Sequence, residues 1–247
     1  MPNTDILQSR KLLNNFILSQ LSFAFQDNIR TDLFREEDFL HLEENVGAVR
    51  FLKKFFAQDN FNRSLYPSLI IKGEAASGKT HLLHIFAKKF NAEFVDKEKI
   101  AEINLVRFFL RNSFYILEDI TEIKDEELLL QLINSAFEAG AFLILSSRGT
   151  PQVQLKDLAS RLKNIFAVEI RNPTYESIKQ LLAKGFSRRQ IKVSKQIIDF
   201  ISDNIDRSYE AALVVLKIVE LRCEQNGKNL TMSEVREMIW GVVFPLV

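Results

Sequence analysis

Short apolar runs alternate with helix-like apolar stripes over the first two thirds of the chain. Continuous apolar runs predict strands buried on both faces of a sheet, because such strands lack the polar alternation of a half-exposed strand. The expected strands are 68–72, 93–95, 114–117, 141–145 and 166–170. Helical spacing predicts helices over 45–57, 79–90 and from Asp125, a capping residue, to Gly140, a helix-ending one. This order indicates an α/β fold with a parallel sheet covered on both faces.

The pattern changes after Asn172-Pro173, and from there on it predicts helices alone. The expected helices are 174–184, 194–204, 208–225 and 231–240. The predicted parts of the chain are an N-terminal arm over 1–30, an α/β domain over 31–172 and a small all-α domain over 173–247.

A glycine-rich segment carries the clearest chemistry. It matches G-x-x-x-x-G-K-[ST] and reads Gly73-Glu74-Ala75-Ala76-Ser77-Gly78-Lys79-Thr80. The glycines let the backbone approach phosphate oxygens, and the loop N–H groups with the next helix form an anion cradle. Lys79 would neutralise the terminal phosphates, and Thr80 would give its hydroxyl to Mg²⁺. A chance match is the alternative, but the position between a buried strand and an amphipathic helix favours a nucleotide site.

Two acids, Glu118 and Asp119, directly follow the apolar strand 114–117. Carboxylates at this end of a parallel strand lie beside the phosphate loop in open α/β folds. Their expected roles are to hold the water shell of the metal, for Glu118, and to orient the attacking water, for Asp119. The alternative is a pair of solvated acids that begin a loop.

Composition limits the partners and the compartment. The 247 residues contain 33 Lys and Arg against 32 Asp and Glu, so a net charge of +1 gives no global attraction for nucleic acid. The basic segment 184–195 is better explained as a solvated face than as a phosphate track. The single cysteine, Cys223, excludes an intrachain disulfide, and no apolar run approaches the roughly 20 residues of a membrane span. We therefore expect a cytoplasmic protein without a membrane partner.

Several segments, in order along residues 20–240, resemble the DnaA/Hda family of AAA+ proteins. They are 34–45 ahead of the phosphate loop, 73–84, Leu145–Arg148 with Pro151, Asp157–Leu162 and Arg207-Ser208. The resemblance implies an AAA+ P-loop domain, a helical lid from about residue 173, and bound ADP or ATP with Mg²⁺. It also implies that His81, Ser147 and Arg207 lie near the nucleotide.

Arg161 stands in the segment Asp157-Leu158-Ala159-Ser160-Arg161-Leu162, which is similar to a conserved box of this family. The resemblance implies that Arg161 reaches the nucleotide of a neighbouring subunit, where an arginine finger is worth about 10³–10⁵ in rate. From spacing alone, an i−4 ion pair with Asp157 is the preferred interpretation.

The segment Gln20-Leu21-Ser22-Phe23-Ala24-Phe25 is similar to the hexapeptide by which members of this family bind the DNA sliding clamp. Gln20 would make polar contacts, while Leu21, Phe23 and Phe25 would enter an apolar pocket on the clamp. The alternative is an arm that packs on its own core.

Three departures from the family pattern weaken the case for fast ATP hydrolysis by this chain. Glu118 stands where an Asp is usual, Ser147 holds the polar first-sensor position where some relatives have Asp, and Glu210 falls where the second-sensor arginine is expected, with Arg207 one turn earlier. The sequence shows no basic recognition helix after Trp240, so we expect no sequence-specific DNA binding.

The resemblance predicts an Hda-like regulator that binds adenine nucleotide and the sliding clamp and promotes hydrolysis of DnaA-bound ATP. The alternatives are a self-hydrolysing AAA+ ATPase, such as a helicase loader or a DnaA-like DNA-binding initiator, and a binding-only adaptor with a decayed nucleotide site. Self-association into a homo-oligomer stays open.

Overall fold

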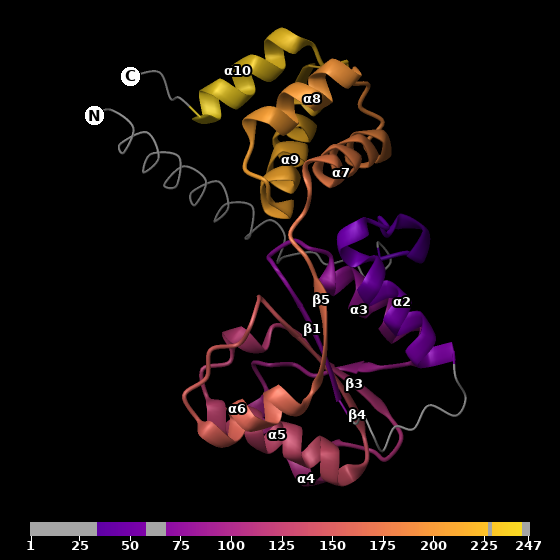
Figure 1. Ribbon diagram of the computed structural model, residues 1–247, viewed down its shortest axis with the longest axis vertical. Helices are drawn as coiled ribbons and strands as arrows, with labels where there is room; N and C mark the ends of the chain where they lie inside the picture. The colour runs from indigo at the N-terminus through magenta and orange to yellow at the C-terminus, as the bar shows by residue number, and fades with distance from the viewer. Residues whose placement is uncertain (1–33, 58–67, 227–228, 244–247) are drawn as a thin grey trace. The chain divides into compact units, whose positions relative to one another are not determined.

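The computed structural model describes residues 34–57, 68–226 and 229–243. These residues belong to two compact units, one over Phe34–Asn172 and one from Pro173 onward (Figure 1). The predicted N-terminal arm and its hexapeptide lie outside the described residues. Among the described residues, no helix combines the length and the apolar character that a membrane crossing requires.

The first unit is built on a five-stranded sheet in which every neighbouring pair is parallel. The strands are β1 (Ser68–Gly73), β2 (Glu93–Phe94), β3 (Phe114–Leu117), β4 (Phe142–Ser147) and β5 (Phe166–Ile170), in the order β2-β3-β4-β1-β5. All carboxyl ends therefore meet at one edge, where Lys72 pairs with Ser147 and Leu117 with Leu145. The predicted α/β fold with a parallel sheet is confirmed.

Helices cover both faces of this sheet. The elements are α2 (Glu43–Ala57), α3 (Lys79–Phe90), α4 (Leu105–Phe108), α5 (Glu126–Ala139) and α6 (Lys156–Asn164), with short 3-10 turns η2 (Glu36–Asp38), η3 (Ile100–Glu102) and η4 (Ile120–Glu122). Ile70 and Leu143 share one buried cluster with Leu132 of α5 and Leu158 of α6, and Figure 1 shows α4, α5 and α6 gathered together. On the other face the ring of Phe114 contacts that of Phe86 on α3. Strand residues alternate between the two layers, as the pleat requires.

Local signals explain the ends of α5. The Asp125 carboxylate accepts a hydrogen bond of 2.9 Å from the Leu128 N–H, and Gly140 ends the helix with φ of 68°. Both features satisfy backbone groups that a helix end leaves without partners, and both were predicted. Strand β4 differs from the prediction because it continues through Ser146 and Ser147, two buried polar residues that stay in register with β1.

The second unit consists of helices around its own apolar core. They are α7 (Tyr175–Arg188), α8 (Lys195–Asn204), α9 (Tyr209–Asn226) and α10 (Met232–Val243). Gly185 lets α7 and α9 approach closely, since a Cβ there would lie 2.3 Å from Leu216 Cδ1. Arg189, from the basic segment, faces Glu220 of α9 with an Nε–Oε1 distance of 3.4 Å. Part of that segment therefore holds helices together, whereas the sequence predicted a solvated face.

Candidate nucleotide site

The loop from Gly73 to Thr80 joins the carboxyl end of β1 to the start of α3. At Gly73, a Cβ would lie 2.8 Å from Ser77 Oγ and 3.1 Å from the carbonyl oxygen of Ile170, so only glycine fits without a shift. Gly78 has φ of 94°, in the left-handed region that favours glycine, and Ala76 has φ of 60°. These positive angles turn the loop toward the start of α3, where the first N–H groups have no intrahelical acceptors, as at any helix start.

Lys79 lies beneath this loop and is buried. Its Nζ donates to the carbonyl oxygens of Gly73 and Glu74, each at 2.8 Å. Burial lowers the pKa of the Lys79 ammonium, and the nearby carboxylate of Asp119 opposes that shift most strongly. An ammonium has three donors, and the third faces Ser77 Oγ at 3.5 Å, a long contact that an anion in the loop can replace.

Thr80 and Glu118 bring a hydroxyl and a carboxylate together at the same edge of the sheet. Burial raises the pKa of the Glu118 carboxyl, and the nearby Thr80 hydroxyl opposes that shift most strongly. The described residues contain no group of three or more His, Cys, Asp and Glu side chains that could hold a metal by themselves. The pair instead fits Mg²⁺, which is bound in such sites by one or two protein oxygens, phosphates and waters.

Asp119 is held by several neighbours. Its φ is 48°, its backbone N–H donates to Ser146 Oγ at 2.9 Å, and its carboxylate accepts from Thr121. Arg148 Nε lies 2.6 Å from Asp119 Oδ2 and its Nη2 donates to Glu122 at 3.0 Å. Sequence reasoning assigned no role to Ser146 or to the side chain of Arg148, although both stand in the segment Leu145–Arg148 that the resemblance marked.

Ser147 ends β4 and is fully buried. Its hydroxyl donates to the carbonyl oxygen of Gly149 at 2.7 Å. Because β4 lies between β1 and β3, Ser147 occupies the carboxyl edge between Lys72 of β1 and the acids that follow β3. The structure therefore places Ser147 at the carboxyl edge of the sheet, as predicted, and the hydroxyl of its neighbour Ser146 accepts from the backbone N–H of Asp119.

The segment ahead of the sheet packs against the first turns of α3. His81 Nε2 lies 2.9 Å from the carbonyl oxygen of Arg35, and the Phe34 ring stacks on His84 at 4.4 Å between centroids. Phe39 contacts the loop directly, since its ring would lie 3.3 Å from a Cβ on Gly78. The structure thus brings residues 34–39 beside the phosphate loop, together with His81.

The roles of Arg161, Arg207 and the clamp-binding residues stay predictions. Arg161 lies on α6 and is exposed, its guanidinium carbon 5.7 Å from the centre of the Phe137 ring, and it forms no ion pair with Asp157. Arg207 is exposed in the second unit, directly before α9, and its role stays a prediction. The predicted clamp-binding residues fall outside the described residues: Gln20, Leu21, Phe23 and Phe25.

Comparisons with known proteins find similarity in both sequence and fold. The chain is 23% identical over 201 residues to the chromosomal replication initiator protein DnaA of Bacteroides thetaiotaomicron, over 71% of this chain and 43% of that protein. Its structure matches domain III of Thermotoga maritima DnaA with a TM-score of 0.69 at 17% identity, covering 86% of this chain and 98% of that one. AMPPCP-bound DnaA from Aquifex aeolicus matches with a TM-score of 0.61 at 19% identity, covering 82% and 66%. No family model matches the chain.

Sheet order, loop and helical unit define the class of protein by its fold: a parallel α/β domain with the fold of DnaA domain III. Within that class, similarity in sequence and in fold supports a relation to the DnaA-like replication initiators. The chain spans about half the length of the curated relatives it matches.

Proposed function

We propose that the chain binds an adenine nucleotide with Mg²⁺ at residues 73–80 and acts as a regulator of replication initiation. The observation that carries the binding step is the buried Lys79 ammonium, fixed by two loop carbonyls close to Thr80 and Glu118. A buried cation beside a loop of N–H groups is a site for polyphosphate. The similarity to AMPPCP-bound DnaA supports the choice of an adenine nucleotide.

Each part of the site has a distinct task in binding. The loop N–H groups from Gly73 to Gly78 and the Lys79 ammonium take the phosphates. Thr80 and Glu118 hold the metal and its waters, and bound Mg²⁺ supplies charge neutralisation between the phosphates. His81 and the packed segment 34–39 close the side of the loop next to α3.

Two features favour regulation of a partner over turnover by the chain itself. The Asp119 carboxylate is occupied by Arg148 and Thr121, so it is poorly placed to orient a water molecule. Arg161, by contrast, is exposed on α6 and forms no ion pair with Asp157. We propose that Arg161 enters the nucleotide site of a DnaA-type initiator and stabilises charge on the γ-phosphate during hydrolysis.

The tether of this regulator is the hexapeptide Gln20–Phe25, bound to the DNA sliding clamp. Tethering would raise the local concentration of Arg161 at clamp-loaded DNA and so block repeated initiation. The double variant Gln20→Ala with Leu21→Ala should lose binding to immobilised clamp. Binding equal to that of the wild type would remove the tether from the proposal.

The regulatory step is tested by measuring ATP hydrolysis by the initiator with and without this chain. Stimulation should fall to background with Arg161→Ala, while nucleotide binding by the chain stays unchanged. Lys163→Ala, two residues along α6 on the exposed surface, is the matched control and should stimulate like the wild type. Equal stimulation by the Arg161→Ala protein would refute the regulator.

One observation favours the second candidate, a self-hydrolysing AAA+ ATPase. Lys79, Thr80 and Glu118 lie at the same edge of the sheet, where they would serve phosphate and metal binding in hydrolysis. Strong ATP turnover by the purified chain, abolished by Lys79→Ala, would establish this candidate and replace the regulator.

A further inference from the structure

Phe137 is one of few large apolar side chains that the described residues leave exposed. The others are Val46, Leu110 and Leu221. Phe137 lies in the last turn of α5 and is 49% exposed, while its neighbours Ile133 and Ala136 are buried in the core under the sheet. The ring therefore contributes little to that core, and it lies instead against the guanidinium of Arg161.

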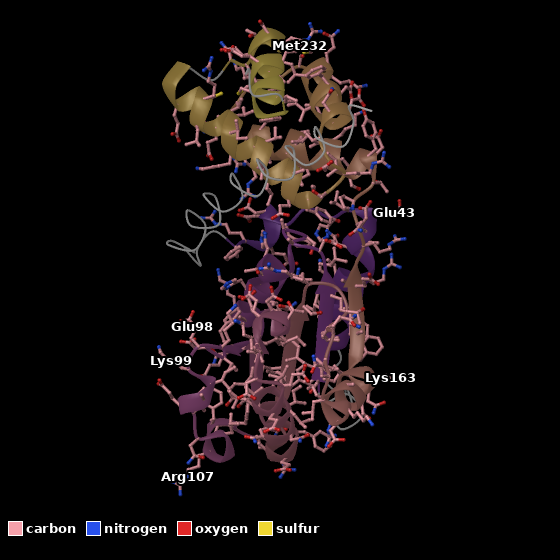
Figure 2. All side chains as sticks on the ribbon, turned by 90° about the vertical axis from the view of Figure 1, so that its left-hand side faces the viewer. Glu43, Glu98, Lys99, Arg107, Lys163 and Met232 are labelled. Carbon is pink, nitrogen blue, oxygen red and sulfur yellow. The ribbon has the colours of Figure 1, made fainter. Side chains whose placement is uncertain are left out.

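The backbone of α6 is fixed next to this ring. Leu158 and Leu162 anchor the helix in the same buried cluster as Leu129 and Leu132 of α5. Lys163 projects from the outer side of the unit, which shows that α6 is a surface helix (Figure 2). Because the backbone of α6 is fixed, the position of the Arg161 guanidinium depends on the direction of its side chain. The centre of the Phe137 ring lies 5.7 Å from the guanidinium carbon and can set that direction.

A ring face holds a guanidinium differently from a carboxylate. A carboxylate such as Asp157 would take two of the five N–H donors and neutralise the charge. A ring attracts the cation through its quadrupole and leaves the donors in the guanidinium plane available. An arginine that must contact a phosphate needs a fixed direction, full charge and unused donors, and an aromatic neighbour provides all three.

We propose that Phe137 is a positioning residue that orients the Arg161 guanidinium for the phosphate of a partner's nucleotide. This inference rests on the proposed role of Arg161. A cation–π contact at an exposed site corresponds to about a two- to fivefold effect. Phe137→Leu, which keeps apolar volume but lacks the ring, should therefore lower stimulation of initiator hydrolysis by about that factor.

The contact is first tested in the chain alone, without any partner. The Arg161 Nε–H resonance, assigned by its loss in Arg161→Lys, should shift in Phe137→Leu because the ring current disappears. Phe137→Tyr keeps a ring and should retain the wild-type resonance. Identical resonances in the wild type and Phe137→Leu would overturn the inference, whatever the regulatory assay shows.

The functional test uses the full chain and an ATP-loaded initiator. Fluorinated phenylalanines at position 137 remove negative charge from the ring face at nearly constant size, so stimulation should decline stepwise with fluorination. Val46→Ala, an exposed apolar change on α2, is the matched control and should leave stimulation unchanged. The melting temperature and nucleotide affinity should match the wild type in every variant.

The outcomes separate the two proposals. If Arg161→Ala abolishes stimulation while Phe137→Leu and the fluorinated proteins equal the wild type, Phe137 has no positioning role. If Arg161→Ala itself has no effect, the proposed regulator fails. A loss in Val46→Ala equal to that in Phe137→Leu would also overturn the inference, because it would show a general effect of surface apolar side chains.

Discussion

At the scale of single residues, the candidate site depends on charges that the fold buries and then partners. Lys79 is buried and bound by two carbonyls, and Glu118 lies near the Thr80 hydroxyl and the Lys79 ammonium. Their pKa shifts have opposite directions and the same leading cause, burial, which disfavours the charged form of each. Burial of these two charges therefore costs free energy in the ligand-free protein, and the opposite charges of a bound polyphosphate and its metal would offset that cost.

Removal of the Lys79 ammonium should weaken nucleotide binding with little effect on folding. Lys79→Ala deletes a charged donor, so ADP and ATP affinity should fall by about tenfold or more in calorimetric titration. Lys88→Ala, an exposed lysine in the last turn of the same helix, is the control and should bind like the wild type. Equal affinities for both variants would refute the phosphate site.

Glu118→Gln should stabilise the ligand-free protein and weaken Mg²⁺-nucleotide binding. A carboxyl whose pKa is raised in the folded state binds its proton more tightly when folded. The free energy of unfolding therefore falls as pH rises from the ordinary value of 4.5 through the raised folded pKa. Glutamine cannot ionise, so the variant should melt higher at neutral pH. A lower melting temperature, or unchanged Mg²⁺ dependence of binding, would contradict this.

Sequence predicted these residues better than it predicted their partners. Gly73, Gly78, Lys79 and Thr80 follow from one local pattern, because their spacing along the chain sets their geometry. The contacts of Asp119 with Ser146 and Arg148 join residues far apart in the chain and exist because β3 and β4 are neighbours. Strand order is a property of the folded sheet, and hydrophobic periodicity does not encode it.

At the scale of elements, long periodic segments were predictable and short ones were not. Helix α3 and strand β5 coincide with their predicted ranges, because apolar spacing and clear end signals agree there. The four-residue helix α4 and the three 3-10 turns contain too few residues to show a period. Strand β4 was predicted too short because its last two residues are serines, which are buried by neighbouring strands.

The packing of α7 on α9 gives a prediction at this scale. Gly185→Ala should destabilise the protein by about 1–3 kcal/mol, although alanine is the better helix former, because its Cβ would overlap Leu216. Chemical denaturation measures the loss. Adding Leu216→Ala should remove the Gly185→Ala penalty, so that the added methyl group costs nothing in that background. An equal cost in both backgrounds would rule out the steric explanation.

At the scale of the whole molecule, the chain divides into units with separate cores. The sequence predicted strands alternating with helices before Pro173 and helices alone after it, and the structure has this order of elements. The similarity to domain III of DnaA covers most of this chain and nearly all of that domain. Fold class is predictable because it depends on the order of elements more than on their exact ends.

Nucleotide should stabilise the molecule through the first unit. Ligand at 100 times its dissociation constant adds about 2.7 kcal/mol to the free energy of unfolding, so ADP with Mg²⁺ should raise the melting temperature. Hydrogen exchange should slow in residues 73–80 and at the end of β3. Lys79→Ala, with about tenfold lower affinity, should gain only about 1.4 kcal/mol at the same ADP concentration, and its loop should be less protected from exchange. Unchanged exchange in the wild-type loop would place binding elsewhere.

The close fit of Gly73 against Ile170 has a mechanical consequence. The two residues are cross-strand partners, Gly73 at the end of β1 and Ile170 at the end of β5. After Ile170 the chain leaves the sheet and reaches Pro173 within three residues. Because Gly73 has no side chain, its backbone packs directly on Ile170, and a shift of the phosphate loop would move the backbone that contacts this residue. A methyl group at residue 73 would therefore disturb the end of β5 as well as the phosphate loop, because its Cβ would lie 3.1 Å from the carbonyl oxygen of Ile170.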